Sequence, residues 1–413
     1  MVIRTSRSSN KLVRAGRSDA HPPESGMPPS GSVGERIHYI DWLRAAAVVG
    51  VVVYHSLLPF GTSKWHINNA ERSGLLTTVL LVFETFGLGL LFLLAGASAR
   101  FALRRRSPRV FLMERGRRIL IPFVVGTLLL TPPMMYIAAV HDGSTSESLL
   151  TFLAAWPAGA IAWALETGIS PRLFSIGFHL WFLGYLFAFS ALGLPVFRLL
   201  SSVRGRALLD ALGRAARWPG ASLAFALLIA LPPLVLLPLA PDEFDWWQFG
   251  WFGAYFLVGY VLYGDDRLVA AVRRDVIPAL LVALTTLAGL IVLNFNGWVA
   301  SHEGMGYSYD ATYLLMIVMY AVGGWAWTLV LLNVGLRLRV LQRPLPRVAG
   351  EAVLPLYILH LPVVLLVTSI VVTWPFGLLP KALIVTAASL AGSIAITAAL
   401  LRATPARILL GVR

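Results

Sequence analysis

The sequence predicts an all-α protein embedded in a membrane, with about ten transmembrane helices. Of the 413 residues, 57% are hydrophobic and only 13% are charged, whereas about a quarter of the residues of a soluble globular protein are charged. Apolar runs of about 20 residues recur along the chain, and each is long enough to cross a hydrocarbon core of about 30 Å. Because backbone amides inside lipid must be paired within their own segment, each run is expected to be a helix.

Ten of these runs are expected to span the membrane. They lie at about 39–60, 75–98, 118–140, 178–200, 221–240, 246–264, 277–297, 312–335, 352–374 and 381–401. Another apolar run, residues 149–165, is short and contains Pro157 and Gly159. We interpret this run as a re-entrant or interfacial segment.

The distribution of Lys and Arg predicts how the spans are oriented. If the N-terminus is cytoplasmic, all Lys and Arg residues fall on the cytoplasmic side except Lys64, Arg72, Arg172, Lys381 and, within the first span, Arg44. The positive-inside rule predicts this sorting. A further span at 149–165 would move the arginines between 198 and 217 to the outside and break the pattern. We therefore expect ten spans with both termini in the cytoplasm.

Three segments are expected. Residues 1–35, rich in Ser, Arg, Gly and Pro, are predicted to be a disordered cytoplasmic tail; residues 36–402 form the ten-helix domain, and 403–413 a cytoplasmic C-terminal tail. The net charge is +14. Most of it is explained by basic loops on the cytoplasmic side, which lie beside the anionic lipids of the inner leaflet. Membrane lipids are therefore expected partners, and nucleic acid is not. The absence of cysteine excludes disulfides, thiolate catalysis and Cys-ligated metal.

The first span carries three ionisable residues, Asp41, Arg44 and His55, and such groups normally face a protein interior or a water-filled cavity. A helix turns about 100° per residue, so Arg44 and His55 share a face to within about 20° and lie about 16 Å apart along the axis. Asp41 can pair with Arg44 at a spacing of three residues. A polar stripe from the cytoplasmic surface inwards is one interpretation; a lipid-facing Arg44 and a structural His55 are the alternatives.

Five other polar residues stand out. Arg115 and Arg118 begin the third span and are expected to project the same way; paired guanidinium groups match phosphate oxygens, and a cluster that only sets topology is the alternative. Glu84 lies inside the second span, as a packing contact, a protonated acid or a cavity residue. His179 is expected near the outer interface, and His360 in the inner half of the membrane.

Four motifs, in chain order, resemble those of the integral-membrane acyltransferase 3 family. Arg44 and His55 match the family's R-x10-H motif, and "RGRR" at 115–118 matches its R-x-x-R motif. "FLLAGAS" resembles its "FFxxSG" segment, and "LYILHLP" its "Y-x-x-Y-L-x-H" segment. The resemblance runs from about residue 36 to 402.

One further segment resembles a branch of that family. "HLWFLGYL" is similar to the branch related to periplasmic glucan succinyltransferases, whereas the branch that acetylates lipopolysaccharide carries a Glu in a "WSLxxE" segment there. Gly184 and Tyr185 occupy this region, and Ala95 replaces the Ser of the "SG" segment. No role is therefore carried over to these positions.

The resemblance implies transfer of an acyl group, acetyl or succinyl, from cytosolic acyl-CoA to a hydroxyl of a carbohydrate or related acceptor, at or across the bacterial cytoplasmic membrane. His55 is then the base or acyl carrier, with Arg44 and Asp41 beside it, and Arg115 and Arg118 bind the CoA phosphates. The remaining candidates for the acceptor site or a pore lining are Glu84, His179 and His360. No metal or prosthetic group is expected.

A secondary transporter of an anionic or acylated small molecule is the second hypothesis. The pairs Pro132–Pro133 and Pro232–Pro233 could interrupt two spans, as in the discontinuous helices of transporters. No internal repeat links the two halves of the chain, which disfavours this reading. Release of free CoA separates the two hypotheses, because a transporter does not cleave the thioester.

Overall fold

The described part of the chain is helical throughout. The structure, a computed structural model, describes residues 37–239, 245–296 and 311–412, and no strand occurs among them. The predicted all-α class is confirmed. The predicted tail, residues 1–35, lies outside the described residues.

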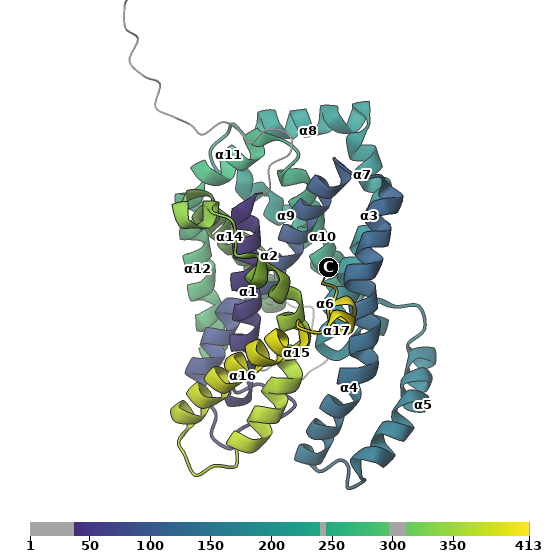
Figure 1. Cartoon of the computed structure of the whole chain (residues 1–413). Helices are drawn as coiled ribbons and strands as arrows, with labels where there is room; N and C mark the ends of the chain where they lie inside the picture. Colours follow the sequence, from purple (N-terminus) through teal and green to yellow (C-terminus); the bar gives the residue numbers. More distant parts are fainter. Residues whose placement is uncertain (1–36, 240–244, 297–310, 413) are drawn as a thin grey trace, which may run out of the picture. The chain divides into compact units, whose positions relative to one another are not determined.

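Among the described residues, nine helices are long and apolar enough to cross a membrane. They comprise the predicted spans other than 221–240 and 246–264, together with the run at 149–165 (Figure 1). Their elements are α1 (His38–Leu57) with η1 (Leu58–Phe60), α2 (Gly74–Leu103), α3 (Pro108–Arg115) with η2 (Gly116–Leu120) and α4 (Ile121–Asp142), α5 (Leu149–Thr167), η3 (Pro171–Leu180) with α6 (Trp181–Leu192), α12 (Val276–Phe295), α14 (Ala311–Arg337), α15 (Arg347–Val371) and α16 (Leu378–Leu400).

The other elements are shorter. The two remaining predicted spans are η4 (Ala221–Ala224) with α9 (Phe225–Leu236), and α10 (Trp246–Leu262). The end of the predicted fourth span is a separate helix, α7 (Leu194–Ser201). Three short elements lie in the connections between helices, α8 (Val203–Ala215), α11 (Asp266–Arg274) and η5 (Arg339–Gln342), and a fourth, α17 (Thr404–Leu409), follows α16.

Helix α5 is the run predicted to be a re-entrant or interfacial segment, and that role stays a prediction. It is one unbroken helix of 19 residues with Pro157 in its interior, and none of its residues is buried. Trp156 Nε1 donates a hydrogen bond to Met135 Sδ at 3.4 Å, and the rings of Tyr136 and Phe152 pack edge to face, which holds α5 beside α4. A helix that is apolar on all sides and exposed on most of them suits contact with lipid.

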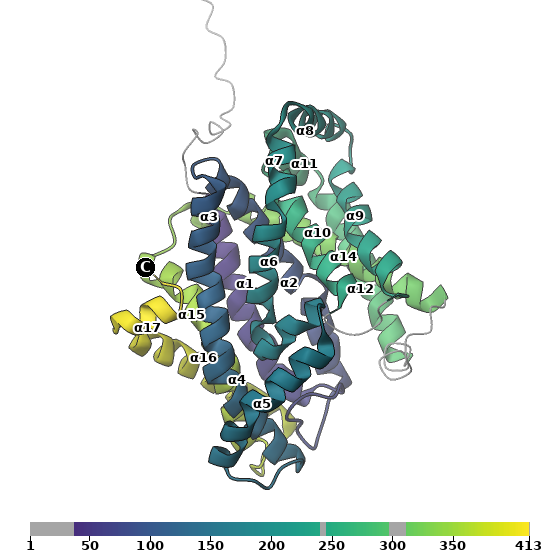
Figure 2. The same cartoon turned by 90° about the vertical axis from the view of Figure 1, so that its right-hand side faces the viewer.

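The arginine-rich segments gather at one end of the helices. In both views α8, α11 and the start of α3 lie at the same end, at the top (Figures 1 and 2). The connections that follow α4 and α15 lie at the opposite end. This grouping is what the positive-inside rule requires of a common cytoplasmic face, and the direction of the chain across the membrane stays a prediction.

Helices α2 and α10 are in backbone contact at the centre of the fold. A Cβ added to Gly96 would lie 1.9 Å from the carbonyl oxygen of Phe256, and one added to Gly259 would lie 2.0 Å from that of Leu93. Small residues permit such close approach of membrane helices, where lipid removes the hydrophobic drive for association. Helix α2 thereby forms a fixed support for α1, which packs against both α2 and α15.

Candidate active site

Three of the predicted histidines meet in the interior. The ring centroid of His360 on α15 lies 5.0 Å from that of His55 on α1, and also 5.0 Å from that of His179 at the end of η3. His360 is 0% exposed and His179 is 8% exposed, while His55 is partly buried. Imidazoles from three segments far apart in the sequence therefore form one group, which we call the histidine cluster.

Each ring of the histidine cluster is held through one nitrogen. His55 Nδ1 donates to the carbonyl oxygen of Val51 at 2.8 Å, His179 Nε2 to that of Ile358 at 3.0 Å, and His360 Nδ1 to that of Tyr357 at 2.6 Å. Because a carbonyl oxygen only accepts hydrogen bonds, these nitrogens carry the protons of the neutral rings.

The opposite nitrogens of the rings hold the lone pairs. Within the part of the chain that the structure describes, the buried atoms His179 Nδ1 and His360 Nε2 have no hydrogen-bond partner. A buried polar atom left in this state is costly unless it serves a ligand or a proton. The cluster thus offers buried proton acceptors beside His55.

His179 is buried among the helices, and its predicted depth near the outer interface stays a prediction. Residues 171–180 form a 3-10 segment instead of the start of a long α-helix, and Phe178 adopts φ 56° and ψ −126°. Side chains with a Cβ rarely occupy this region, and doing so costs about 1–3 kcal/mol. The turn directs the chain inwards, and the Tyr357 hydroxyl donates to the carbonyl oxygen of His179 at 2.5 Å.

The contact between His55 and His360 bears on their depth in the membrane. The sequence predicts His360 in the inner half, and because the two rings are in contact, His55 lies at about the same depth; the half in which they lie stays a prediction. Counting residues from a predicted helix start gives only a nominal depth, because tilt and helix offset are set by packing.

Arg44 lies further along α1, towards its N-terminus. Its NH1 group pairs with Asp41 Oδ1 at 3.1 Å, as the three-residue spacing predicts, and its NH2 group donates to Ser98 Oγ of α2 at 2.8 Å. The Arg44 side chain is 34% exposed. The Arg44 guanidinium is thus bound to side chains of α1 and α2 and is partly exposed at the surface of the protein.

The pair Arg115 and Arg118 stands at an irregular turn. Arg115 ends α3, and Arg118 lies in η2, which has the wider π-helical hydrogen bonding. Such turns occur often at functional sites. The two arginines make different contacts: Arg115 lies over the ring of Phe111, while Arg118 Nε donates to the carbonyl oxygen of Gly411 at 3.5 Å. The expectation that both project the same way stays a prediction. The charges of both Arg44 and Arg118 act on Arg115.

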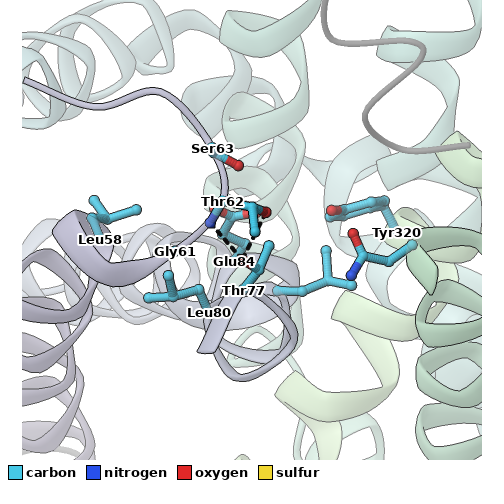
Figure 3. A pocket seen from close by; sticks show the side chains of 10 residues that line it. Leu58, Gly61, Thr62, Ser63, Thr77, Leu80, Glu84 and Tyr320 are labelled. Carbon is cyan, nitrogen blue, oxygen red and sulfur yellow. Dashed lines mark hydrogen bonds between the residues drawn. The ribbon is translucent and has the colours of Figure 1, made fainter. Parts of the chain in front are cut away.

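Glu84 lines a pocket at the other end of α1. The pocket has a volume of about 150 Å³ and lies between η1, the following loop, α2, α12 and α14. Figure 3 shows Glu84 with Thr62, Ser63 and Tyr320 around it. Of the three readings of Glu84, the structure agrees with a cavity residue. The hydroxyl of Tyr54, the neighbour of His55, donates a hydrogen bond to its carboxylate.

Four residues near these groups were missed from the sequence. Tyr54 and Tyr357 adjoin predicted histidines, and their position in the quoted motifs was a usable signal. Ser98 closes the "FLLAGAS" segment, but nothing in the sequence ties it to Arg44. His66 lies in a loop, and its ring stacks on that of Phe178 at 4.4 Å between centroids. No local sequence pattern predicts this contact.

The arrangement supports acid–base and anion chemistry. Neutral imidazole accepts and returns protons near neutral pH, and exposed guanidinium groups bind phosphate. Among the described residues, no group of three or more His, Asp or Glu side chains could hold a metal ion.

The fold and the site together define an integral-membrane acyltransferase. The chain matches the family model described as an acyltransferase domain over residues 37–398, and it belongs to that family. The R-x10-H motif, the R-x-x-R motif and the histidine cluster all lie within the matched region. The family expected from the motifs is therefore confirmed.

The similarity to individual curated proteins is low and covers only part of the chain. The chain is similar to the "Glucans biosynthesis protein C" of Salmonella paratyphi B, of Salmonella heidelberg and of Salmonella schwarzengrund, with 25% identity over 162 residues in each case. The match covers 39% of this chain and 39% of each relative, so it spans about two fifths of their length. No solved structure matches the chain.

Proposed function

We propose that the protein moves an acyl group, acetyl or succinyl, from cytosolic acyl-CoA to a hydroxyl of a carbohydrate or related acceptor, at or across the bacterial cytoplasmic membrane. The observation that carries this proposal is the contact between His55 and His360, with the partly exposed Arg44 on the same helix as His55. Family membership supports acyl transfer. The name of the glucan-related relatives supports a carbohydrate acceptor.

The donor is expected to bind at the arginine-rich end. Arg115 and Arg118 bind the phosphates of CoA, and Arg44 lies where the pantetheine arm enters beside α1. From Arg44 to His55 the arm covers about 16 Å along the helix axis. The thioester then reaches the imidazole while the charged part of the donor stays outside the apolar region, which avoids the cost of burying phosphate charge.

His55 Nε2 is the proposed general base. It removes the proton of the acceptor hydroxyl as the oxygen attacks the thioester carbonyl; the C–S bond breaks, and the CoA thiolate leaves and takes the proton from the imidazolium. The products are the ester and free CoA. A covalent route, in which His55 first takes the acyl group and then passes it on, uses the same nitrogen.

The other two imidazoles support this step. His360 packs between His55 and His179, and the nitrogens of His179 and His360 not bound to carbonyls are the buried acceptors described above. These nitrogens are the bases nearest to His55 that could share the proton it removes from the acceptor.

The test is a comparison of His55→Ala with His141→Ala, a control at the exposed His141. Each purified variant is given acetyl-CoA or succinyl-CoA with envelope glycans from cells that lack the gene, and free thiol and glycan esters are measured. His55→Ala should lose transfer by at least about 10²-fold, and His141→Ala should not. A near-normal rate in His55→Ala would refute its role, and a wild-type protein that releases no CoA would favour the transporter hypothesis.

A further inference from the structure

We infer that the pocket lined by Glu84 is the acceptor subsite and that it binds one hexopyranose ring. This inference rests on the proposed function, because it gives the acceptor a place and a size. It also assigns Tyr54 as a positioning residue that couples the subsite to His55.

The lining of the pocket has the chemistry of a sugar site. A carboxylate (Glu84), an amide (Asn294) and the hydroxyls of Thr62, Ser63 and Tyr320 surround an apolar floor. Carboxylate and amide oxygens accept hydrogen bonds from sugar hydroxyls, and side-chain hydroxyls both donate and accept. Pockets that combine a few placed polar groups with apolar walls are typical of small-ligand sites.

The size of the pocket limits the ligand. A cavity of about 150 Å³ holds a ring of benzene's size, and this pocket has that volume, so it admits no more than one sugar ring of an acceptor. Thr62 Oγ1 and Thr77 Oγ1 are hydrogen-bonded at 2.9 Å, and the backbone amide of Thr62 donates to the same Thr77 oxygen at 2.8 Å. These bonds fix the loop wall against α2, so the pocket is formed before a ligand arrives.

The Glu84 carboxylate is linked to the histidine cluster through Tyr54. The Tyr54 hydroxyl donates to Glu84, and the Tyr54 ring meets the His55 ring edge to face at 5.3 Å between centroids. A carboxylate inside a membrane helix is costly and marks a functional site by default. Tyr54 thus lies between the Glu84 carboxylate and His55, which is why the inference assigns it the positioning role.

The pocket and the pair Arg115 and Arg118 lie at opposite ends of α2. It adjoins η1 and the starting half of α2, whereas Arg115 and Arg118 lie on the elements that follow the opposite end of α2. Donor and acceptor would then approach the histidine cluster from opposite ends. Acyl transfer across the membrane follows from that geometry without movement of the sugar through the protein.

The experiment uses the fact that the chain has no cysteine. Ser63→Cys places one thiol in the pocket, and its rate of labelling by a maleimide is measured in nanodiscs with the methyl glycosides of glucose, galactose and mannose. At least one glycoside should slow labelling by about 5-fold or more, whereas the linear polyol mannitol should not. Labelling of the control Ser146→Cys, in an exposed loop, should not change.

A second variant tests the carboxylate. Glu84→Gln in the Ser63→Cys background should weaken the protecting glycoside by about 10-fold to 100-fold, the effect of losing a hydrogen bond to a charged group, and should raise the KM for the glycoside but not for acyl-CoA. Tyr54→Phe should keep glycoside protection and lower kcat, since it removes only the link to Glu84.

The outcomes separate this inference from the proposed function. If wild-type protein transfers acyl groups but none of the three glycosides protects Ser63→Cys, or if Glu84→Gln leaves protection unchanged, the subsite assignment is overturned and the transferase stands. If a glycoside protects the thiol through Glu84 while no acyl-CoA is consumed, the pocket binds a sugar but is not an acceptor subsite, and the transferase fails. Where a glycoside protects Ser63→Cys, His55→Ala should retain that protection.

Discussion

The ring of His360 lies 5.0 Å from the ring of His55, although 305 positions (360 minus 55) separate them in the sequence. Because His360 Nδ1 donates to the Tyr357 carbonyl, its Nε2 atom is the one able to accept a proton. His360 is therefore expected to share the proton that His55 removes from the acceptor.

His360→Gln tests that sharing. Glutamine retains a donor for the Tyr357 carbonyl but cannot be protonated, so kcat should fall by about 10²-fold with the KM for acyl-CoA unchanged. The pH–rate profile should lose one ionisation on its acidic limb. A purely structural His360 would instead give a variant with lowered thermal stability and an unaltered profile.

Arg115 and Arg118 are expected to contribute unequally to donor binding. Arg118 is exposed and contacts the C-terminal segment, whereas Arg115 is partly buried and near Arg44. Arg115→Ala should raise the KM for acyl-CoA by about 10-fold to 100-fold. Arg118→Ala should raise this KM by a smaller factor, and kcat should be unchanged in both variants. Arg109→Ala, at an exposed neighbouring position, is the control; an equal effect there would show that general positive charge, rather than this pair, attracts the donor.

The sequence was sufficient for the all-α class, for most of the long helices and for the Asp41–Arg44 pair on α1, since span length and i,i+3 spacing are local properties; it did not predict that the helices at 221–240 and 246–264 are short. It identified His55, His179 and His360 separately but not their contact. That contact depends on how η3 and α15 pack, and in lipid such packing is set by shape complementarity rather than by a hydrophobic stripe. The π-helical turn at Arg118 and the backbone of Phe178 were also invisible, because neither residue type is typical of its conformation.

Phe178 provides a direct test of that strained backbone. Both Phe178→Ala and Phe178→Gly lose the contact with His66, but only glycine relieves a φ of 56°, worth about 1–3 kcal/mol. Phe178→Gly should therefore melt at a higher temperature than Phe178→Ala, the reverse of the usual order. Melting of the two variants by intrinsic fluorescence decides this, and a more stable Ala variant would show that the backbone is relaxed there.

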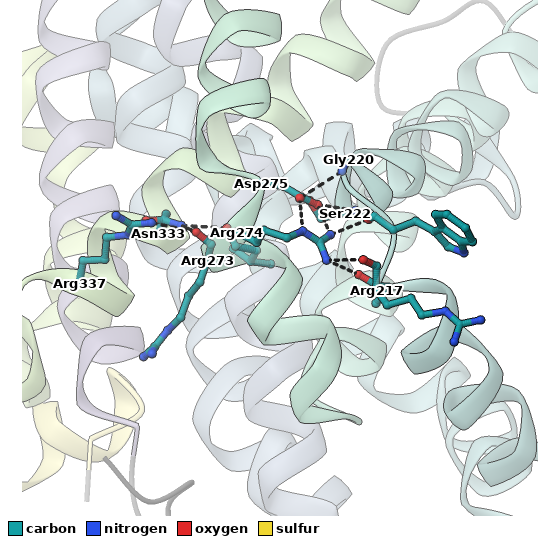
Figure 4. A network of polar contacts seen from close by, with 11 residues as sticks. Arg217, Gly220, Ser222, Arg273, Arg274, Asp275, Asn333 and Arg337 are labelled. Carbon is teal, nitrogen blue, oxygen red and sulfur yellow. Dashed lines mark hydrogen bonds and ion pairs between the residues drawn. The ribbon is translucent and has the colours of Figure 1, made fainter. Parts of the chain in front are cut away.

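Asp275 is expected to be the main polar support of the arginine-rich end. Its carboxylate is 2% exposed and accepts hydrogen bonds from Arg274, from the Gly220 and Ser222 amides and from the Ser222 hydroxyl (Figure 4). Asp275→Ala should lower the free energy of unfolding by about 1–3 kcal/mol, because buried donors lose their acceptor. Asp210→Ala, at an exposed ion pair, should lower it by much less, because solvent screens exposed ion pairs.

The same carboxylate should make stability depend on pH. Burial alone would raise the pKa of Asp275, but the hydrogen bonds from Arg274, Ser222 and Gly220 outweigh it and hold the pKa below its ordinary value of 3.8. A lowered folded-state pKa stabilises the fold fully above the pKa of the unfolded chain and loses that contribution as the pH falls through the folded-state value. The difference in melting temperature between wild type and Asp275→Asn should thus be constant above about pH 5 and shrink below about pH 4. A constant difference down to pH 3 would contradict this role.

Helix α5 makes the orientation of the chain testable in one experiment. It is long and apolar enough to cross, yet a crossing there would put the arginines of α8 on the outside, against the positive-inside rule. We therefore expect α5 to be embedded in the membrane without crossing it.

The experiment uses single cysteines at Ser146→Cys, before α5, and Ala211→Cys, on α8. Both positions are exposed, and the chain has no native cysteine. In intact cells a membrane-impermeant maleimide should label Ser146→Cys alone, and Ala211→Cys should react only after permeabilisation. Labelling of both from outside would mean that α5 completes a crossing, and the reverse pattern would mean that the arginine-rich end faces outwards, which would remove the cytosolic donor from the arginines proposed to bind it.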